Sequence, residues 1–295
     1  MDEPEATSKA LQSKALQSVA DVYAKNVFDL LGLLSLPYAM LRIGVHNTQQ
    51  IEFFLQAVAE TKILLRTKED KARVMAYAGE LMKKATEEKS SPKNPHEEAN
   101  RQLAKLLEKK NVSDAARALL YAGISSGWAA FESAAKDIWV VALNSRPKLL
   151  AQPAFAKLTD EAATEGLSAK HVSVGLLARH GFDLRDKLGL LLSDKFDFTG
   201  VSGIRIAYTS AFGKSSVFDT MFNEQNLATL EATRHLIVHR AGFVDEDYKR
   251  RTKDNVPIGQ QLHFDSARVC ELVNSSITVC CKLMRQVDEW LVKNQ

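Results

Sequence analysis

Residues 113–144, SDAARALLYAGISSGWAAFESAAKDIWVVALN, contain no proline and are predicted to form one long helix. Ser113 followed by Asp114 is a good N-cap, because both side chains satisfy free amides and the acid complements the helix dipole. Large apolar side chains recur along the stretch at spacings that give a helix one buried face. They are Leu119, Leu120, Trp128, Phe131, Ile138, Trp139 and Val140. Pro147 and Pro153 are expected to end this helix.

The composition favours an all-α fold. The chain of 295 residues is 45% hydrophobic and 25% charged, which is typical of a soluble globular protein and excludes disordered, collagen-like and disulfide-scaffold chains. Its 14 glycines and 7 prolines are fewer than average usage would give, which disfavours a fold of many short strands and turns. The formal charge of +3 is too small to indicate nucleic-acid binding by itself.

Several features predict a cytoplasmic protein. The three cysteines, Cys270, Cys280 and Cys281, are an odd count without a paired spacing, which favours a reducing compartment. The N-terminus, MDEPEATSK, is acidic and polar, unlike a secretory signal. The longest uncharged apolar run, Leu30–Leu41, has about half the length that a bilayer span needs. We therefore expect this run to be buried core or a partner interface, and we expect no membrane association.

The N-terminal part is predicted to form two helices separated by a proline. Apolar residues spaced three to five apart predict a helix over residues 6–34. Pro37 is expected to break the helical pattern. Asn47 or Thr48 can then cap a second helix that carries an apolar stripe of its own.

The charge and proline pattern divides the chain into two regions. Residues 69–89 alternate charge signs and predict a solvated helix, and KSSPKNPHE at 89–97 predicts an exposed loop or boundary. We place an N-terminal helical region with its linker at residues 1–112 and a helical domain at residues 113–295. Within that domain, residues 155–225 are expected to supply short helical pieces, separated by glycines, that serve packing.

The second informative stretch is residues 224–242, EQNLATLEATRHLIVHRAG. It predicts a helix that ends near Gly242, a residue type suited to a left-handed C-cap. Arg234 falls on the predicted apolar stripe, where an arginine is costly unless its head reaches water or is matched by another group. The stripe is expected to consist of Leu227, Leu230, Ile237, Val238 and Ala241. A final helix is expected over residues 265–293.

Arg234 and His239 are the residues in this helix best suited to chemistry on a phosphate. His239 lies five positions after Arg234, which places the two residues about 140° apart around the helix axis. They cannot converge on one small target from a regular helix. Three arrangements stay open: the last turn unwinds before Gly242, the arginine side chain sweeps round the helix, or two copies of the helix face each other across a dimer axis.

The sequence around this pair resembles that of a known family. Arg234-His235 is followed by LIVHRAGFVDEDY and KRRTKD, and upstream lies WAAFESAAKDIW with Phe131-Glu132. This pattern resembles the HEPN superfamily, in its RiboL-PSP branch, over residues 113–295. The family motif is an arginine, a polar residue and, a few residues later, a histidine. This chain departs from it with His235 where Asn or Asp is usual, and with Arg240 where Asn often follows the histidine.

The resemblance implies a HEPN-like helical bundle that cleaves RNA without a metal or other cofactor. In that chemistry the 2′-hydroxyl attacks the adjacent phosphorus and leaves a 2′,3′-cyclic phosphate and a 5′-hydroxyl. The residue types suit it, because the imidazole of His239 can move protons near neutral pH and the fork of Arg234 can hold phosphate oxygens. The histidines form no zinc-binding sequence pattern.

Several neighbours are candidates for supporting roles. His235, Arg240 and Glu132 are auxiliary candidates, and Glu132 is either an acid that orients Arg234 or a histidine, or an exposed helical residue. Six Lys or Arg against three acids lie between Arg234 and Lys253, so the excess positive charge is concentrated beside the motif. The residues predicted to contact RNA are Lys249, Arg250, Arg251 and Tyr248, although packing under the loop is the favoured role for Tyr248.

The resemblance also implies partners and a biological setting. Members of the family act as homodimers, with the two motifs facing one cleft, in toxin–antitoxin or antiviral defence systems. An antitoxin or a sensor protein is therefore a possible partner besides RNA. The alternative is a non-catalytic helical module that binds a protein, a nucleotide or RNA.

Overall fold

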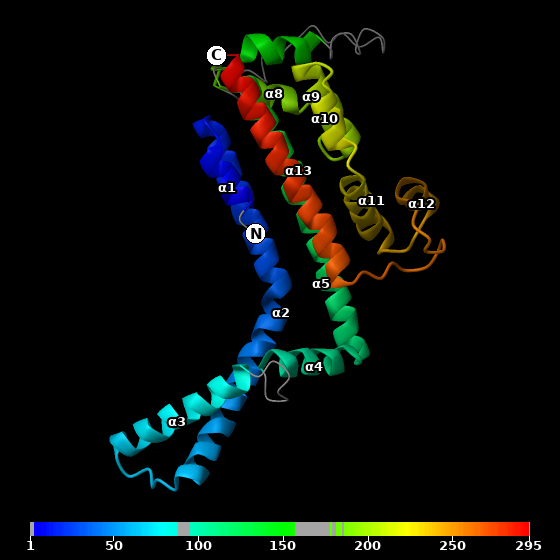
Figure 1. The fold of residues 1–295 in the computed structure, drawn as a ribbon. Helices are drawn as coiled ribbons and strands as arrows, with labels where there is room; N and C mark the ends of the chain where they lie inside the picture. The colour runs from blue at the N-terminus through cyan, green and yellow to red at the C-terminus, as the bar shows by residue number, and fades with distance from the viewer. Residues whose placement is uncertain (1–2, 88–94, 157–177, 179–180, 185, 295) are drawn as a thin grey trace. The chain divides into compact units, whose positions relative to one another are not determined.

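The computed structural model describes residues 3–87, 95–156, 178, 181–184 and 186–294, and these residues form an all-α protein (Figure 1). This confirms the predicted fold class. Within the described residues, extended structure is limited to an isolated antiparallel bridge between Phe243 and Gln261. The helices are α1 (Glu3–Ala10), α2 (Lys14–Thr61), α3 (Lys68–Glu87), α4 (Pro95–Leu107), α5 (Lys110–Ser145), η1 (Pro147–Ala151), α8 (Leu188–Ser193), α9 (Val201–Phe212), α10 (Ser216–Phe222), α11 (Gln225–Arg240), α12 (Glu246–Thr252) and α13 (Ser266–Lys293).

The chain forms two compact units whose boundaries differ from the predicted division at residue 112. One unit combines Met1–Leu30 with Leu120–Gln295, and the other consists of Leu31–Leu119. The difference has a physical cause, because the first thirty residues are held by the C-terminal helix of the chain. Helices α2 and α5 each contribute residues to both units.

A buried carboxylate on α13 fixes the N-terminal segment. Asp288, only 5% exposed, accepts hydrogen bonds from the backbone N–H groups of Gln12 (2.8 Å) and Ser13 (2.9 Å), between α1 and α2. Helix α1 packs along α13, and Arg285 donates to the Thr7 hydroxyl (2.8 Å). These contacts satisfy amides that no helical carbonyl reaches, and they account for the position of residues 1–30 in the C-terminal unit.

Helix α5 supplies the core predicted for it. Trp128, Phe131, Ile138 and Trp139 are all at most 1% exposed, while Leu119, Leu120 and Val140 are partly buried. The helix begins at Lys110, one turn before the predicted cap, and ends at Ser145, before Pro147 opens η1.

Two buried aromatic side chains connect α5 to α9. The indole N–H of Trp139 donates to the backbone carbonyl of Ala207 (2.9 Å), and the Tyr208 hydroxyl donates to the carbonyl of Ala135 (2.8 Å). Both rings are fully buried, so each polar atom needs a partner inside the protein. The reciprocal pair fixes how α9 sits on α5.

The predicted break at Pro37 is wrong, because α2 continues through this residue as one helix of 48 residues. A proline removes one helical hydrogen bond and strains the preceding turn, and a long helix with good formers on both sides can absorb this cost. Asn47 and Thr48 accordingly lie inside the helix and cap nothing. In the unit of residues 31–119, α2 and α3 share an apolar cluster that contains Phe53, Ala57, Val74 and Ala78.

Part of the apolar run in α2 is exposed. Leu33, Leu36 and Met40 are 46% to 63% exposed, so this part of the run is not buried core. By length and composition, α2 is the one helix among the described residues that could span a membrane, and 11% of its most apolar window is buried. A single crossing would separate residues 1–30 from residues 120–295, although these form one compact unit.

We predict that Asp288→Ala lowers the free energy of unfolding by about 2–4 kcal/mol, because two partly buried backbone N–H groups lose their charged acceptor. Glu289→Ala is the matched control, since Glu289 is the exposed neighbour on the same helix. Chemical denaturation followed by circular dichroism measures both variants. Equal stabilities of the two variants would show that Asp288 does not anchor the N-terminal segment.

Candidate functional site

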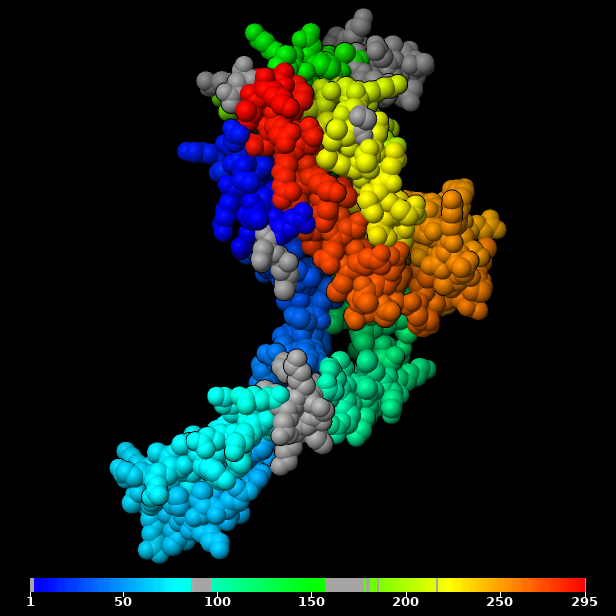
Figure 2. All heavy atoms as spheres, viewed as in Figure 1, coloured from blue at the N-terminus to red at the C-terminus, as the bar shows by residue number. Residues whose placement is uncertain are grey.

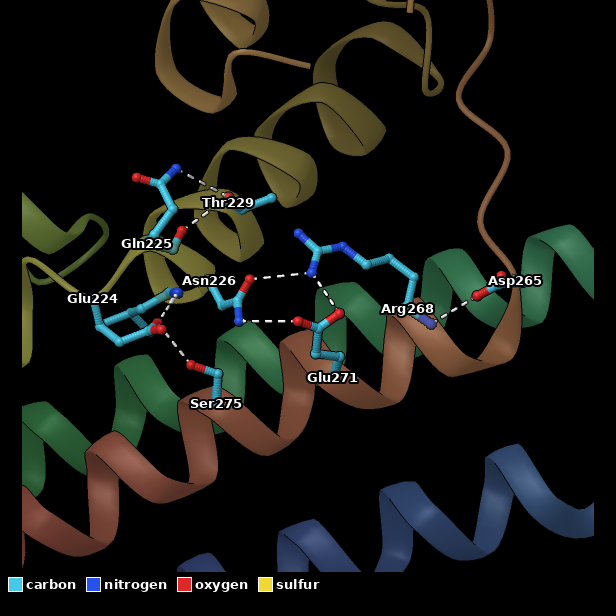
Figure 3. Close-up of polar contacts among 9 residues, drawn as sticks. Glu224, Gln225, Asn226, Thr229, Asp265, Arg268, Glu271 and Ser275 are labelled. Carbon is cyan, nitrogen blue, oxygen red and sulfur yellow. Dashed lines mark hydrogen bonds and ion pairs between the residues drawn. The ribbon is translucent and has the colours of Figure 1, made fainter. Parts of the chain in front are cut away.

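Helix α11 carries the motif, and its N-terminal end is fixed to α13. Glu224 is the N-cap, and its carboxylate accepts hydrogen bonds from the Leu227 N–H (2.7 Å) and from the Ser275 hydroxyl on α13 (2.7 Å). Figure 3 shows both contacts converging on this carboxylate. The cap therefore both starts α11 and joins it to α13.

A second set of polar contacts joins α11 to α13, one turn before Ser275 on α13. Arg268 donates to Asn226 (3.1 Å) and to Glu271 (2.6 Å), and Asn226 donates to Glu271 (3.3 Å; Figure 3). Glu271 is exposed, so each contact adds little stability. Together with the Glu224 cap they restrict the rotation of α11 about its own axis.

The buried face of α11 differs from the predicted stripe. Val238 is 54% exposed and Ile237 is only partly buried, so the prediction was wrong for the last two turns. Small and polar residues replace them on the inner face, because tight packing against α12 and α13 favours short side chains. The buried residues are Leu227, Thr229, Leu230, Ala232, Thr233 and Leu236.

The C-terminal end of α11 is regular and sharply terminated. The helix continues to Arg240, Ala241 is left-handed with φ 51°, and Gly242 has φ 83°. The Gly242 N–H donates to the Leu236 carbonyl (3.2 Å), and a Cβ on Gly242 would lie 2.3 Å from the Tyr121 hydroxyl oxygen. The prediction of a left-handed glycine is therefore confirmed, with the cap starting one residue earlier. The last turn does not unwind, which removes one of the three arrangements considered for Arg234 and His239.

Arg234 is half-buried, and Glu132 of α5 lies close enough to feel its charge. Glu132 also accepts a hydrogen bond from the Trp128 indole (2.9 Å). Burial raises the pKa of the Glu132 carboxyl above its ordinary value; the indole hydrogen bond and the charge of Arg234 oppose this, and Asp197 adds to it. The cost of placing an arginine on the inner side of α11 is thus reduced by a nearby acid. Of the two roles considered for Glu132, this geometry favours that of an acid beside Arg234.

His235 and His239 lie on the outer face of α11. Both side chains are exposed, and their ring centroids are 4.5 Å apart with the planes inclined by 47°. They are one helical turn apart, so they share a face that differs from the one holding Arg234. Within one chain the structure therefore brings the two imidazoles together and leaves Arg234 half-buried, near enough to Glu132 for its charge to lower the pKa of that carboxyl.

Arg240, the third auxiliary candidate of this helix, is exposed at the final position of α11. Its Nε lies 3.7 Å from a carboxylate oxygen of Asp245. The same Asp245 is the N-cap of α12 and accepts a hydrogen bond from the Tyr248 N–H (2.9 Å). Arg240 thus helps to connect the end of α11 with the start of α12.

The basic segment is folded onto α11 and is not a free tail. Residues 242–262 close on themselves, because the Leu262 N–H donates to the Gly242 carbonyl (2.8 Å) and the Val244 N–H to the Gln260 carbonyl (2.9 Å). Figure 2 shows the segment that contains α12 as a lobe on the side of this unit. The lobe presents its basic side chains on a fixed surface.

The three predicted RNA-contacting cations differ in their surroundings. Arg251 forms an ion pair with Glu231 of α11 (2.7 Å), and only 29% of its side chain is exposed. Arg250 is 78% exposed and pairs with Asp247 on its own helix. Lys249 is partly buried. Arg250 is the most accessible of the three to a phosphate.

Tyr248 does not have the accessible position that an RNA contact requires. Its side chain is 2% exposed and belongs to an apolar cluster with Ala232, Leu236, Val244 and Leu262. Burial is the main reason why the pKa of its hydroxyl is raised above the ordinary value. The structure therefore places Tyr248 in the packing role, because a sealed ring cannot stack on a base.

Sequence analysis missed several contacts that position the site. Trp128 and Glu132 are four residues apart on one helix, so their hydrogen bond could have been predicted from the spacing. Tyr121, whose hydroxyl donates to the Leu262 carbonyl (2.7 Å) beside Gly242, gave no comparable signal. Glu231 also gave none, because its partner Arg251 follows twenty residues later in another helix.

Comparison with family models, with curated proteins and with solved structures gives no match for this chain. Among the residues that the structure describes, no group of three or more His, Cys, Asp or Glu side chains is arranged to hold a metal ion.

We predict that Glu132→Gln stabilises the protein at neutral pH and has a smaller effect in acid. The folded-state pKa of Glu132 is raised above its unfolded value, so ionised Glu132 disfavours the fold above that folded-state pKa and the penalty disappears below the unfolded value. Glutamine keeps an acceptor for Trp128 and carries no charge. Denaturation at pH 7 and at pH 3.5 measures the difference. A stability gain that is equal at both pH values would contradict the assignment.

Proposed function

We propose that the protein is a metal-independent endoribonuclease in which His239 and Arg234 act on one phosphodiester. The observation that carries this proposal is the exposed imidazole of His239, with that of His235 one turn away, at the end of the helix that also bears Arg234. The resemblance of this stretch to the HEPN superfamily supports the same activity.

The reaction needs proton transfers and charge stabilisation. The 2′-oxygen forms a bond to phosphorus while the bond to the 5′-oxygen breaks, so one proton leaves the 2′-hydroxyl and one is delivered to the 5′-oxygen. His239 moves a proton in this step, and His235 is the nearest second imidazole to assist it. Arg234 holds the phosphate oxygens on which charge grows.

Within one chain the two motif residues lie on different faces of a regular helix, so we infer that the complete site is built from two copies. Arg234 of one copy would then act with His239 of the other. Such a homodimer agrees with the arrangement implied by the family resemblance. Arg250 and Lys249 on the α12 lobe are the side chains that we propose to contact RNA beyond the cleaved bond, with Arg251 behind them.

The biological setting follows from the activity and the resemblance. We propose that the protein degrades RNA in the cytoplasm as part of a toxin–antitoxin or antiviral defence system. The exposed apolar residues of α2 would be available to an antitoxin or sensor protein.

A second function is favoured by one observation. Arg234 lies beside Glu132 and is half-buried, as expected for an arginine whose role is to join α11 to α5. On this reading the protein is a non-catalytic module that binds a protein, a nucleotide or RNA. Binding of ATP or RNA by the wild type, without RNA cleavage, would favour this second function.

The test is incubation of purified protein with single-stranded RNA in EDTA. We expect cleavage by the wild type, a loss of at least about 100-fold in rate for Arg234→Ala and for His239→Ala, and no change for His263→Ala. His263 is an exposed histidine outside the motif and is the matched control. A DNA strand should stay intact because it lacks the attacking hydroxyl.

Circular dichroism of each variant separates loss of catalysis from loss of fold. The products of the wild type should carry a 2′,3′-cyclic phosphate and a 5′-hydroxyl. No cleavage by a folded wild type, or equal cleavage by the variants, would overturn the ribonuclease proposal.

A further inference from the structure

We propose that His235 and His239 form a chelating site for a divalent transition-metal ion, with Cu²⁺ and Ni²⁺ as the ions that fit best. The proposal rests on the position of the two imidazoles and does not depend on ribonuclease activity. It adds a ligand to a surface for which sequence analysis expected no metal.

The separation of the rings matches two imidazoles on one metal ion. A nitrogen–metal distance of about 2.0–2.1 Å places each ring centroid about 3.2 Å from the metal. Two rings at right angles on the metal are then about 4.5 Å apart, and two rings at a tetrahedral angle are about 5.2 Å apart. The observed centroid distance is 4.5 Å. The distance is therefore compatible with a right angle between two ligands once their nitrogens face one ion.

A right angle is the geometry of square-planar and octahedral ions. Cu²⁺ and Ni²⁺ prefer such coordination and bind imidazole well, and the affinity of nitrogen ligands rises from Ni²⁺ to Cu²⁺ and falls again at Zn²⁺. Zn²⁺ prefers a tetrahedral site, which needs a wider angle and usually more protein ligands. We therefore expect the order of affinity Cu²⁺, Ni²⁺, Zn²⁺.

The surroundings of the pair are suited to a cation. Both side chains are exposed and lie in the last two turns of α11, where the free carbonyls of the helix terminus favour positive charge. The nearest cation in sequence, Arg240, has its Nε 3.7 Å from a carboxylate oxygen of Asp245, which offsets its charge. Arg234 is likewise placed near the acid Glu132.

The site has two protein ligands, so water or a solute fills the other positions. Two imidazoles fixed on neighbouring turns bind more tightly than one, because the second binds from a high effective concentration. Removal of either ring should therefore lower the affinity by at least about tenfold. Metal binding also requires both rings to be unprotonated, so it should weaken as the pH falls.

One consequence rests on the proposed function. If His239 transfers protons in RNA cleavage, an ion on this pair occupies the nitrogen that the reaction needs. Bound Cu²⁺ or Ni²⁺ would then inhibit cleavage, and EDTA would restore it.

The proposal is tested by titrating the full chain with NiCl₂, followed by isothermal calorimetry, in the absence of RNA. We expect one equivalent to bind to the wild type and to His263→Ala, and binding to be lost or at least about tenfold weaker in His235→Ala and His239→Ala. Titration with CuCl₂ and ZnCl₂ tests the expected order of affinity.

A second measurement locates the ion. Paramagnetic Ni²⁺ should broaden the imidazole proton signals of His235 and His239 before those of other histidines. Nickel binding that is unchanged in both alanine variants, or no binding by the folded wild type, would overturn the proposal. Because no activity is measured, this result is independent of whether the protein cleaves RNA.

Discussion

The rotation of α11 about its own axis is the constraint on which the candidate site depends. Leu227, Leu230 and Leu236 are fully or almost fully buried, and the Glu224 cap with its bond to Ser275 holds the start of the helix on α13. With the helix fixed in this way, Arg234 is half-buried, whereas His235 and His239 are exposed to solvent. The protein thus separates the arginine of the motif from its histidine by helical geometry alone.

This separation explains how one helix can carry two kinds of chemistry. One side holds Arg234 at partial burial, and its charge reduces the cost that burial imposes on an ionised Glu132. The outer side holds two exposed imidazoles that lie against each other and are accessible to a phosphate or a metal ion. Helix α12 closes the end of α11 and brings basic side chains next to it, since Arg251 is paired with Glu231. In the proposed ribonuclease, a second copy would complete each site by placing its own Arg234 or His239 beside the other residue of the pair.

The sequence predicted those features of the structure that depend on residues close together in the chain. The core of α5 follows from the spacing of Trp128, Phe131 and Trp139, and the left-handed end of α11 follows from Gly242. The predicted helix break at Pro37 was wrong, because the helical propensity of the neighbouring residues outweighs one missing hydrogen bond in a long helix. The inner face of α11 could not be predicted, because it is set by packing against α12 and α13. The favoured packing role of Tyr248 was predicted, but the residues that cover its ring come from distant parts of the sequence.

The most direct test of the central claim is to mix two variants that are each inactive alone. Arg234→Ala and His239→Ala each lack half of the pair, and a mixed dimer holds one complete site only if the two residues act across the subunits. If Arg234 of one copy acts with His239 of the other, half of the dimers after equimolar mixing are mixed dimers, and each of these has one complete site of two. Mixing should therefore restore about one quarter of the wild-type rate of RNA cleavage. If two dimeric, subunit-exchanging variants stay inactive after mixing, Arg234 and His239 do not act together across a dimer, and the account is contradicted.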